Sequence, residues 1–159
     1  MENIIKILEL GKPEKKIKIL ETLHNTNELK ILEQIIFRLN DDSIQVRGEA
    51  FNALLLNDNQ ISKILIDNLN SSNKNIRGFT SLVLANRNEK RAIPEIIKLV
   101  EDKHGMVRSC AIGALGYLKA KKITDVILKL LSDSNLEVQK SALQAAIQTD
   151  IIISTDKIK

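Results

Sequence analysis

The sequence predicts an all-α fold: a right-handed α-α superhelix, or solenoid, of stacked antiparallel helix pairs, with about four full repeats plus a half repeat. Three observations lead to this fold class. The chain repeats itself every 30 or 31 residues, and repeats of such length are typical of solenoids. Each repeat contains two stretches whose apolar residues recur with helical period. The composition, 43% hydrophobic and 28% charged, is that of an ordinary globular protein.

The repeat is clearest in the first predicted helix of each unit. A β-branched residue recurs there at Val46, Ile76, Val107 and Val138. Small residues follow four positions later, at Ala50, Thr80, Ala111 and Ala142. A spacing of four residues keeps both sets on one helix face. Ser43, Asn73 and Asn135 precede these helices and are good N-cap residues, whereas His104 is a poor one.

The second predicted helix of each unit carries its own apolar stripe and ends near Leu39, Leu69, Val100 or Leu131. The whole chain, 1–159, is therefore predicted to be a single repeat domain. Its units cover residues 12–39, 40–69, 70–100 and 101–131, with a half unit at 132–150, a leading helix at 1–11 and a tail at 151–159.

The segment Asp102–Leu115, DKHGMVRSCAIGAL, follows the pattern Asp-x-x-x-x-Val-Arg-x-x-Ala-x-x-Ala-Leu. This pattern resembles HEAT repeats, specifically the short PBS-lyase HEAT-like class. The resemblance implies a structural ladder in which arginine and aspartate side chains join neighbouring repeats. Its members here would be Asp41, Asp102 and Asp133 with Arg47, Arg77 and Arg108. Ser71 and Gln139 replace the expected residues, so the ladder should be weakest there. Gly48 and Gly78 follow two ladder arginines, and we attribute them to close helix packing.

No catalytic residue, metal site or cofactor is predicted. The resemblance extends to a deoxyhypusine hydroxylase-like branch with His-Glu pairs, but neither His24 nor His104 precedes a glutamate. Bilin lyase-like and DNA glycosylase-like branches would need a pocket or groove with aromatic residues, and aromatics make up only 3% of the chain. Phe51, Phe79 and Tyr117 fall on first helices. An enzyme remains a disfavoured alternative, and Cys110 is predicted to be a packed thiol.

The resemblance also implies that the second helices line the concave face. The candidate binding residues that point outward there are Gln34, Phe37, Ile64, Asp67, Arg91, Glu95, Lys98, Lys122, Val126 and Lys129. The first two units present a mixed surface with Phe37 and Ile64 exposed, and the last two present a positive one. The predicted function is a non-catalytic scaffold that binds another protein. The alternative is nucleic-acid binding through the basic half, which the net charge of +4 permits.

No uncharged apolar stretch approaches the length of a membrane span, and the first residues do not follow the order of a signal peptide. A cytoplasmic protein is therefore expected. The half unit leaves Leu143 and Ile147 without a following repeat, and solenoid ends need a cap. Either Ile151–Ile153 fold back over this surface or a second copy covers it. A monomer is favoured, with a homodimer through the C-terminal end as the alternative.

Overall fold

The computed structural model describes residues 1–151, in which ten α-helices and no strand occur. The helices are α1 (Glu2–Leu10), α2 (Pro13–Glu21), α3 (Leu29–Phe37), α4 (Ile44–Leu55), α5 (Ser62–Asp67), α6 (Lys74–Asn86), α7 (Ile93–Lys98), α8 (Gly105–Tyr117), α9 (Thr124–Leu130) and α10 (Leu136–Gln148). Short 3-10 turns extend three of the second helices: η1 (Arg38–Asn40), η2 (Asn68–Asn70) and η4 (Leu99–Glu101). A further turn, η3 (Lys90–Ala92), leads into α7.

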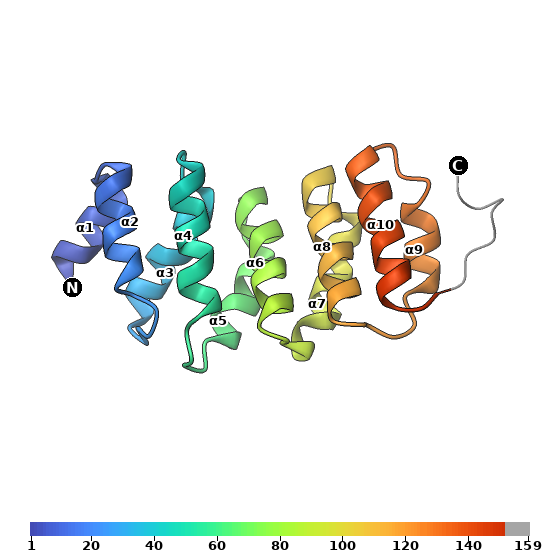
Figure 1. The fold of residues 1–159 in the computed structure, drawn as a ribbon, viewed down its shortest axis with the longest axis horizontal. Helices are drawn as coiled ribbons and strands as arrows, with labels where there is room; N and C mark the ends of the chain where they lie inside the picture. The colour runs from blue at the N-terminus through green and yellow to red at the C-terminus, as the bar shows by residue number, and fades with distance from the viewer. Residues whose placement is uncertain (152–159) are drawn as a thin grey trace.

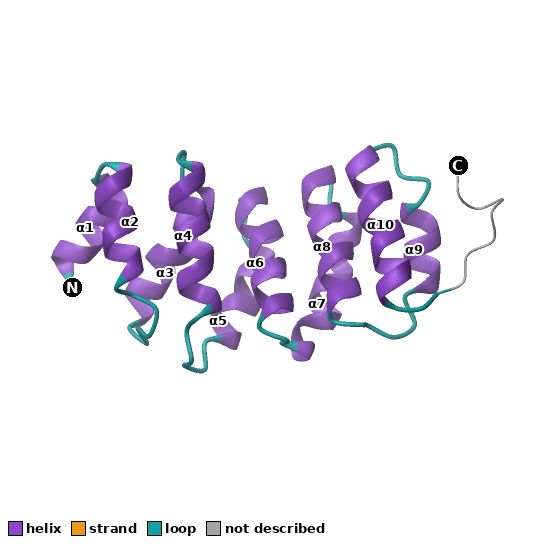
Figure 2. Ribbon diagram, viewed as in Figure 1, coloured by secondary structure: helices purple, strands orange, loops and turns teal. Residues whose placement is uncertain are grey.

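The helices stack side by side in two layers, so the predicted helical solenoid is confirmed (Figures 1 and 2). The first helices of the units, α2, α4, α6, α8 and α10, form the layer nearer the viewer. The second helices, α3, α5, α7 and α9, lie behind them or beside them. Helix α1 packs against both α2 and α3. It therefore takes the place of a second helix from a preceding half unit, and it buries Leu8 completely.

The first helices begin where the N-cap residues predict. The side chains of Ser43, Asn73 and Asn135 each accept backbone N–H groups from the first turn of the following helix. Such a cap stabilises a helix by about 1 kcal/mol. The side chain of His104 makes no cap bond. Instead, its backbone N–H donates to Asp102 Oδ1 at 2.9 Å, so the aspartate orders this turn.

The core lies between the two layers and consists of medium-sized aliphatic side chains. The recurring β-branched positions, Val46, Ile76, Val107 and Val138, are all buried. The small residues one turn later are completely buried as well, which lets neighbouring first helices approach closely. Thr80 is the polar member of that set, and its hydroxyl has no hydrogen-bond partner among the described residues.

Two glycines expected to allow close helix packing behave differently. A Cβ added to Gly78 would lie 2.8 Å from Met106 Sδ and 3.3 Å from Cys110 Sγ, so close packing does explain this glycine. A Cβ added to Gly48 would meet nothing within 4 Å. The expectation for Gly48 was wrong because no side chain of α6 reaches over this part of α4.

Arginine side chains bridge neighbouring units in the second half of the solenoid. Arg77 contacts both carboxylate oxygens of Asp102, at 2.8 and 3.1 Å, and donates to the Ser71 carbonyl at 2.9 Å. Arg108 binds Asp133 in the same way, with both contacts at 2.9 Å, and donates to the Asp102 carbonyl at 2.8 Å. Each planar guanidinium thus holds the loops of two adjacent units with three donors.

The bridges differ in the other units. Lys16 replaces arginine at the first step, and its ammonium lies 2.7 Å from Asp41 Oδ2. Arg38 also contacts that carboxylate, at 3.4 Å. At the last step Gln139 keeps only the bond to the Asp133 carbonyl, at 2.6 Å. Arg47 has no ion-pair or hydrogen-bond partner for its guanidinium within residues 1–151, and Ser71 stands where the next carboxylate would be.

A second set of bridges lies at the opposite ends of the helices. Arg87 donates to the carbonyl oxygens of Leu54, Asn57 and Asn59. Asn57 in turn donates to the Thr26 carbonyl at 2.8 Å, and Asn59 donates to the Asn25 carbonyl at 2.8 Å. The loops of the first three units are therefore tied at this end as well.

The bridging carboxylates should make the stability of the fold sensitive to acid. Burial is the largest single influence on the pKa of Asp102 and of Asp41 and would raise it, but the side-chain hydrogen bonds from Arg77 and Lys16, together with backbone N–H groups and nearby positive charges, lower the pKa overall. The hydrogen bond from Arg108 lowers the pKa of Asp133. A carboxyl group whose pKa is lower in the folded state than in the unfolded state stabilises the fold. This stabilisation is present in full at pH values above the unfolded-state pKa of about 4. That contribution is lost as the pH falls through the lower folded-state pKa.

We therefore expect the free energy of unfolding to decrease below about pH 4. Urea unfolding followed by circular dichroism between neutral and strongly acid pH would measure it. Arg77→Ala should flatten this decrease, because Asp102 would lose the partner that lowers its pKa. Arg47→Ala, which removes no bridge, should leave the decrease unchanged. Identical acid dependence in both variants would contradict the assignment.

The C-terminal half unit leaves part of α10 uncovered. Leu143 is 40% exposed and Ile147 is 64% exposed. Ile151 turns back toward the helix, where its backbone N–H donates to the Ala146 carbonyl at 2.9 Å and its side chain packs against the core. The remainder of the predicted capping segment, residues 152 and 153, lies outside the described residues.

Candidate functional site

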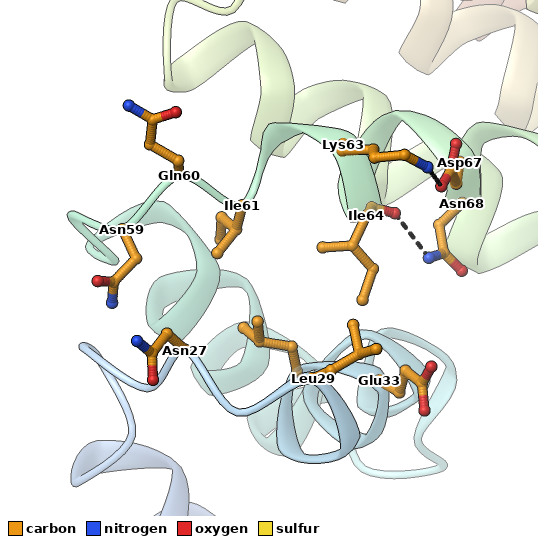
Figure 3. Close-up of a pocket in the computed structure, with 11 residues that line it drawn as sticks. Asn27, Leu29, Glu33, Asn59, Gln60, Ile61, Lys63, Ile64, Asp67 and Asn68 are labelled. Atoms are coloured by element: carbon orange, nitrogen blue, oxygen red, sulfur yellow. Dashed lines mark hydrogen bonds and ion pairs between the residues drawn. The ribbon is translucent and has the colours of Figure 1, made fainter.

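An open groove runs between α3 and α5 in the second-helix layer, with a volume of about 770 Å³. Its floor is apolar and is formed by Leu29, Leu32, Ile61 and Ile64. The side chain of Ile64 points from α5 toward α3 (Figure 3). Leu29, on the first turn of α3, is 59% exposed. We call this feature the α3–α5 groove.

The rim of the α3–α5 groove is polar, and some of its groups are unpaired. Asn68 donates to the Ile64 carbonyl at 2.8 Å, and Lys63 pairs with Asp67 at 2.9 Å. Both members of that ion pair are highly exposed, so water screens the attraction and leaves it weak. Glu33 is exposed and has no ion pair within the described part of the chain. The rim thus carries two carboxylates and one ammonium group.

Local sequence determines the shape of the groove. Helix α5 has only six residues, whereas α3 has nine. The segment before α5 is a tight turn, in which the Ile61 N–H donates to the Asn59 carbonyl and the Asn59 side chain donates to the Asn25 carbonyl. Because the polar segment and the short helix cannot cover the first turn of α3, Leu29 is left facing the opening.

Comparison with known proteins identifies the repeat. A family model described as HEAT repeats matches residues 62–148, which is more than half of the chain. The chain belongs to the HEAT repeat family. A comparison with curated protein sequences found no match.

Two solved structures have the same type of fold as this HEAT repeat protein. One is an engineered protein from the Northeast Structural Genomics Consortium, with a TM-score of 0.51 and 21% identity over 92% of this chain and 78% of the other. The second is a designed armadillo repeat protein in complex with the peptide (KR)4. It gives a TM-score of 0.50 and 21% identity, over 92% of this chain and 80% of that one.

The candidate residues of the first two HEAT units fall in different places. Ile64 and Asp67 line the α3–α5 groove. Ile64 was expected to be exposed but is half-buried on the groove floor. Gln34 faces the other way, toward α1, and its amide donates to Glu9 at 2.9 Å. Phe37 is 55% exposed, and its ring lies 5.3 Å from the Arg38 guanidinium.

The last two HEAT units do not present the uniformly positive surface that was expected. Three of the basic candidates are paired with carboxylates. The pairs are Arg91 with Glu89 at 2.9 Å, Lys98 with Glu95 at 3.0 Å, and Lys129 with Glu101 at 3.1 Å. Lys122 is exposed, with a left-handed φ of 60°. Val126 is half-buried against the core. Glu89 and Glu101 were missed because they lie outside the outward columns of the second helices, whereas Glu95 was itself a candidate and lies on α7 one turn from Lys98.

Two residues of the groove that the sequence analysis missed are Leu29 and Glu33. Leu29 could have been found from the sequence, because it is an apolar residue that lies outside the apolar face formed by Ile31, Ile35 and Ile36. Nothing in the sequence marked Glu33, since exposed polar residues are usual on any helix surface.

The described residues show little that could support catalysis. No group of three or more His, Cys, Asp or Glu side chains within residues 1–151 is placed to hold a metal ion. Burial raises the pKa of the Cys110 thiol to about 11, so it stays protonated and weakly nucleophilic. His104 Nδ1 lies 3.4 Å from Asp102, within the Arg77 bridge. In the same part of the chain, no helix has the length and apolar character to cross a membrane.

Proposed function

We propose that this HEAT repeat protein is a non-catalytic scaffold that binds an extended segment of another protein in the α3–α5 groove. The observation that carries the proposal is the groove itself: an apolar floor that solvent can reach, beside a carboxylate without an ion pair. Burying an apolar side chain there would contribute about 25 cal/mol per Å². Glu33 and Asp67 would favour a lysine or arginine next to that side chain.

The way the groove is anchored supports this proposal. Asn57, Asn59 and Arg87 tie the adjacent loops together, so the walls are ordered before a partner arrives. A pre-ordered site loses less conformational entropy on binding. The designed armadillo repeat protein was solved with a peptide of lysine and arginine. That pairing supports a basic peptide as the ligand type for a helical-repeat surface.

The resemblance to the short PBS-lyase HEAT-like class is part of the same proposal. It is supported by the spacing of 30 or 31 residues and by the segment Asp102–Leu115. The non-catalytic role is supported by the paired or buried state of the residues with the most reactive side chains, His104 and Cys110.

Nucleic-acid binding is the weaker alternative, because carboxylates accompany Arg91, Lys98 and Lys129. A salt titration against duplex DNA and RNA separates the two functions. Phosphate binding gives a steep fall of log affinity with log salt concentration. We expect no measurable duplex binding at physiological salt. A steep slope that is reduced in Lys122→Ala or Lys129→Ala would establish the alternative instead.

The groove is tested by selecting peptides from a random display library on the full chain. We expect selected peptides to combine a large apolar residue with lysine or arginine. Leu29→Ser together with Glu33→Lys should weaken their binding by at least about tenfold, which corresponds to about 1.4 kcal/mol. Leu136→Ser is the matched control, because Leu136 also begins a helix and is 60% exposed. Equal loss in the control, or undiminished binding by the double variant, would refute the groove as the site.

A further inference from the structure

An apolar hollow lies in the first-helix layer, between α4 and α6, in the layer opposite to that of the α3–α5 groove. Its volume is about 460 Å³, and its lining includes Ile44, Arg47, Gly48, Phe51, Phe79 and Leu82. Ile44 at its edge is 72% exposed, and both phenylalanines are only partly buried. We call this feature the α4–α6 hollow.

The hollow exists because α4 and α6 are packed less closely than the later first helices. The glycine of α4, Gly48, faces open space, whereas Gly78 and Gly116 are covered by side chains or backbone of the next first helix. The exposed apolar surface between α4 and α6 is thus uncovered by any described part of the chain. Uncovered apolar surface beside a defined polar group is characteristic of an interaction site.

The polar group is Arg47, which occupies the same repeat position as Arg77 and Arg108 but forms no bridge to the next unit. Arg77 and Arg108 each bind a carboxylate of the following unit and a loop carbonyl. In the unit that follows Arg47, Ser71 replaces the aspartate. The Ser71 hydroxyl accepts a hydrogen bond from the Asn73 N–H at 3.1 Å. Within residues 1–151 the Arg47 guanidinium has no partner, and its Nε is buried. The two terminal amino groups of Arg47 also lack a partner in this part of the chain and are not buried, so they can be reached by an external acceptor, which a charged donor would bind strongly.

We infer that the α4–α6 hollow is a second docking surface, for a partner protein segment in which an aspartate or glutamate adjoins a large apolar side chain. The carboxylate would bind the terminal amino groups of the Arg47 guanidinium with charge-assisted hydrogen bonds. The apolar side chain would fill the space between Phe51 and Phe79. Charge complementarity favours this occupant, because the lining contains one cation and no carboxylate.

Other occupants meet only part of these requirements. A free anion would satisfy Arg47 but would leave Ile44 and the phenylalanines exposed to water. A purely apolar segment would cover the hollow but would leave the guanidinium without an acceptor. A second copy of this chain could offer exposed Leu136 beside Glu137. The experiment below distinguishes that case by the mass of the protein in solution.

The test is an NMR titration of the full, ¹⁵N-labelled chain with the blocked peptide Ac-Gly-Ser-Asp-Phe-Ser-Gly-amide. We expect saturable shifts of backbone amides in 44–51 and 79–82. Replacing the peptide's aspartate by asparagine, or its phenylalanine by serine, should weaken binding by at least about tenfold. Absence of saturable shifts up to millimolar peptide, or equal binding of the asparagine peptide, would overturn the inference.

Three protein variants make the test specific to Arg47. Ser71→Asp would supply the missing carboxylate from within the chain, so it should abolish peptide binding while the protein stays folded. Ser134→Asp adds the same charge to the corresponding loop of a later unit and should leave binding unchanged. Arg47→Gln provides a second loss of binding that does not depend on how Ser71→Asp folds. Undiminished binding in Ser71→Asp and Arg47→Gln, or a dimer that Ser71→Asp dissociates, would overturn the inference.

Discussion

Arg77→Ala should lower the free energy of unfolding by about 1–3 kcal/mol, because it leaves a nearly buried carboxylate without its partner. The Asp102 side chain is only 9% exposed and loses two charged contacts, while the Ser71 carbonyl loses a third. The remaining bond from the His104 backbone N–H cannot replace a positive charge. Chemical unfolding with urea, followed by circular dichroism, measures the change.

Arg47→Ala is the matched control for Arg77→Ala. Both arginines occupy the same position in consecutive units, and both substitutions remove the same atoms. Because Arg47 makes no bridge within the described residues, its removal should change the free energy of unfolding by less than about 0.5 kcal/mol. Equal losses in the two variants would show that general packing of the side chain, and not the bridge to Asp102, carries the effect.

Gly116→Ala should destabilise the fold by about 1–3 kcal/mol, the usual range for overpacking a tight core. An added Cβ would lie 2.7 Å from Ala145 Cα and 2.8 Å from Ala145 Cβ. Ala145 is completely buried on α10, so no side-chain rotation can relieve the clash and the helices must separate. This cost exceeds the gain in helix propensity of up to about 1 kcal/mol that alanine has over glycine.

Gly48→Ala makes the same chemical change on α4, but its effect on the free energy of unfolding should have the opposite sign. Nothing lies within 4 Å of the added Cβ, so only the propensity gain remains, up to about 1 kcal/mol of stabilisation. Thermal or urea unfolding of the two variants side by side measures the contrast. A destabilised Gly48→Ala, or an unaffected Gly116→Ala, would mean that the spacing of the first helices differs from that described above.

The two proposed docking surfaces, the α3–α5 groove and the α4–α6 hollow, differ in their chemistry. The groove combines apolar residues with unpaired or weakly paired carboxylates and suits a basic segment. The hollow combines apolar residues with an unpaired arginine and suits an acidic one. Both lie toward the N-terminal half of the solenoid, whereas in the later units Arg91, Lys98 and Lys129 are paired with carboxylates. Partner binding is therefore expected to be concentrated in the N-terminal half.

The helical repeat, the positions of the first helices and their caps could all be predicted from the amino-acid sequence. These features depend on contacts between residues three or four positions apart, and such contacts appear directly in the spacing of apolar and capping residues. The replacement of aspartate by Ser71 could also be recognised, because equivalent positions of successive units can be compared in one chain. Ser43, Asn73 and Asn135 cap their helices as expected.

Which side chains meet across units could not be predicted from the sequence and became clear only from the packing of the helices. Lys16 binds Asp41, and α1 packs as a partial unit, although neither matches the repeat pattern. The distance between α4 and α6 decides that Gly48 faces a hollow while Gly116 is in tight contact with Ala145. The pairing of Lys129 with Glu101 removes part of an expected basic surface. These contacts depend on how each unit is rotated and translated against the next, and that geometry is set by the sum of many packed side chains, which no local spacing encodes.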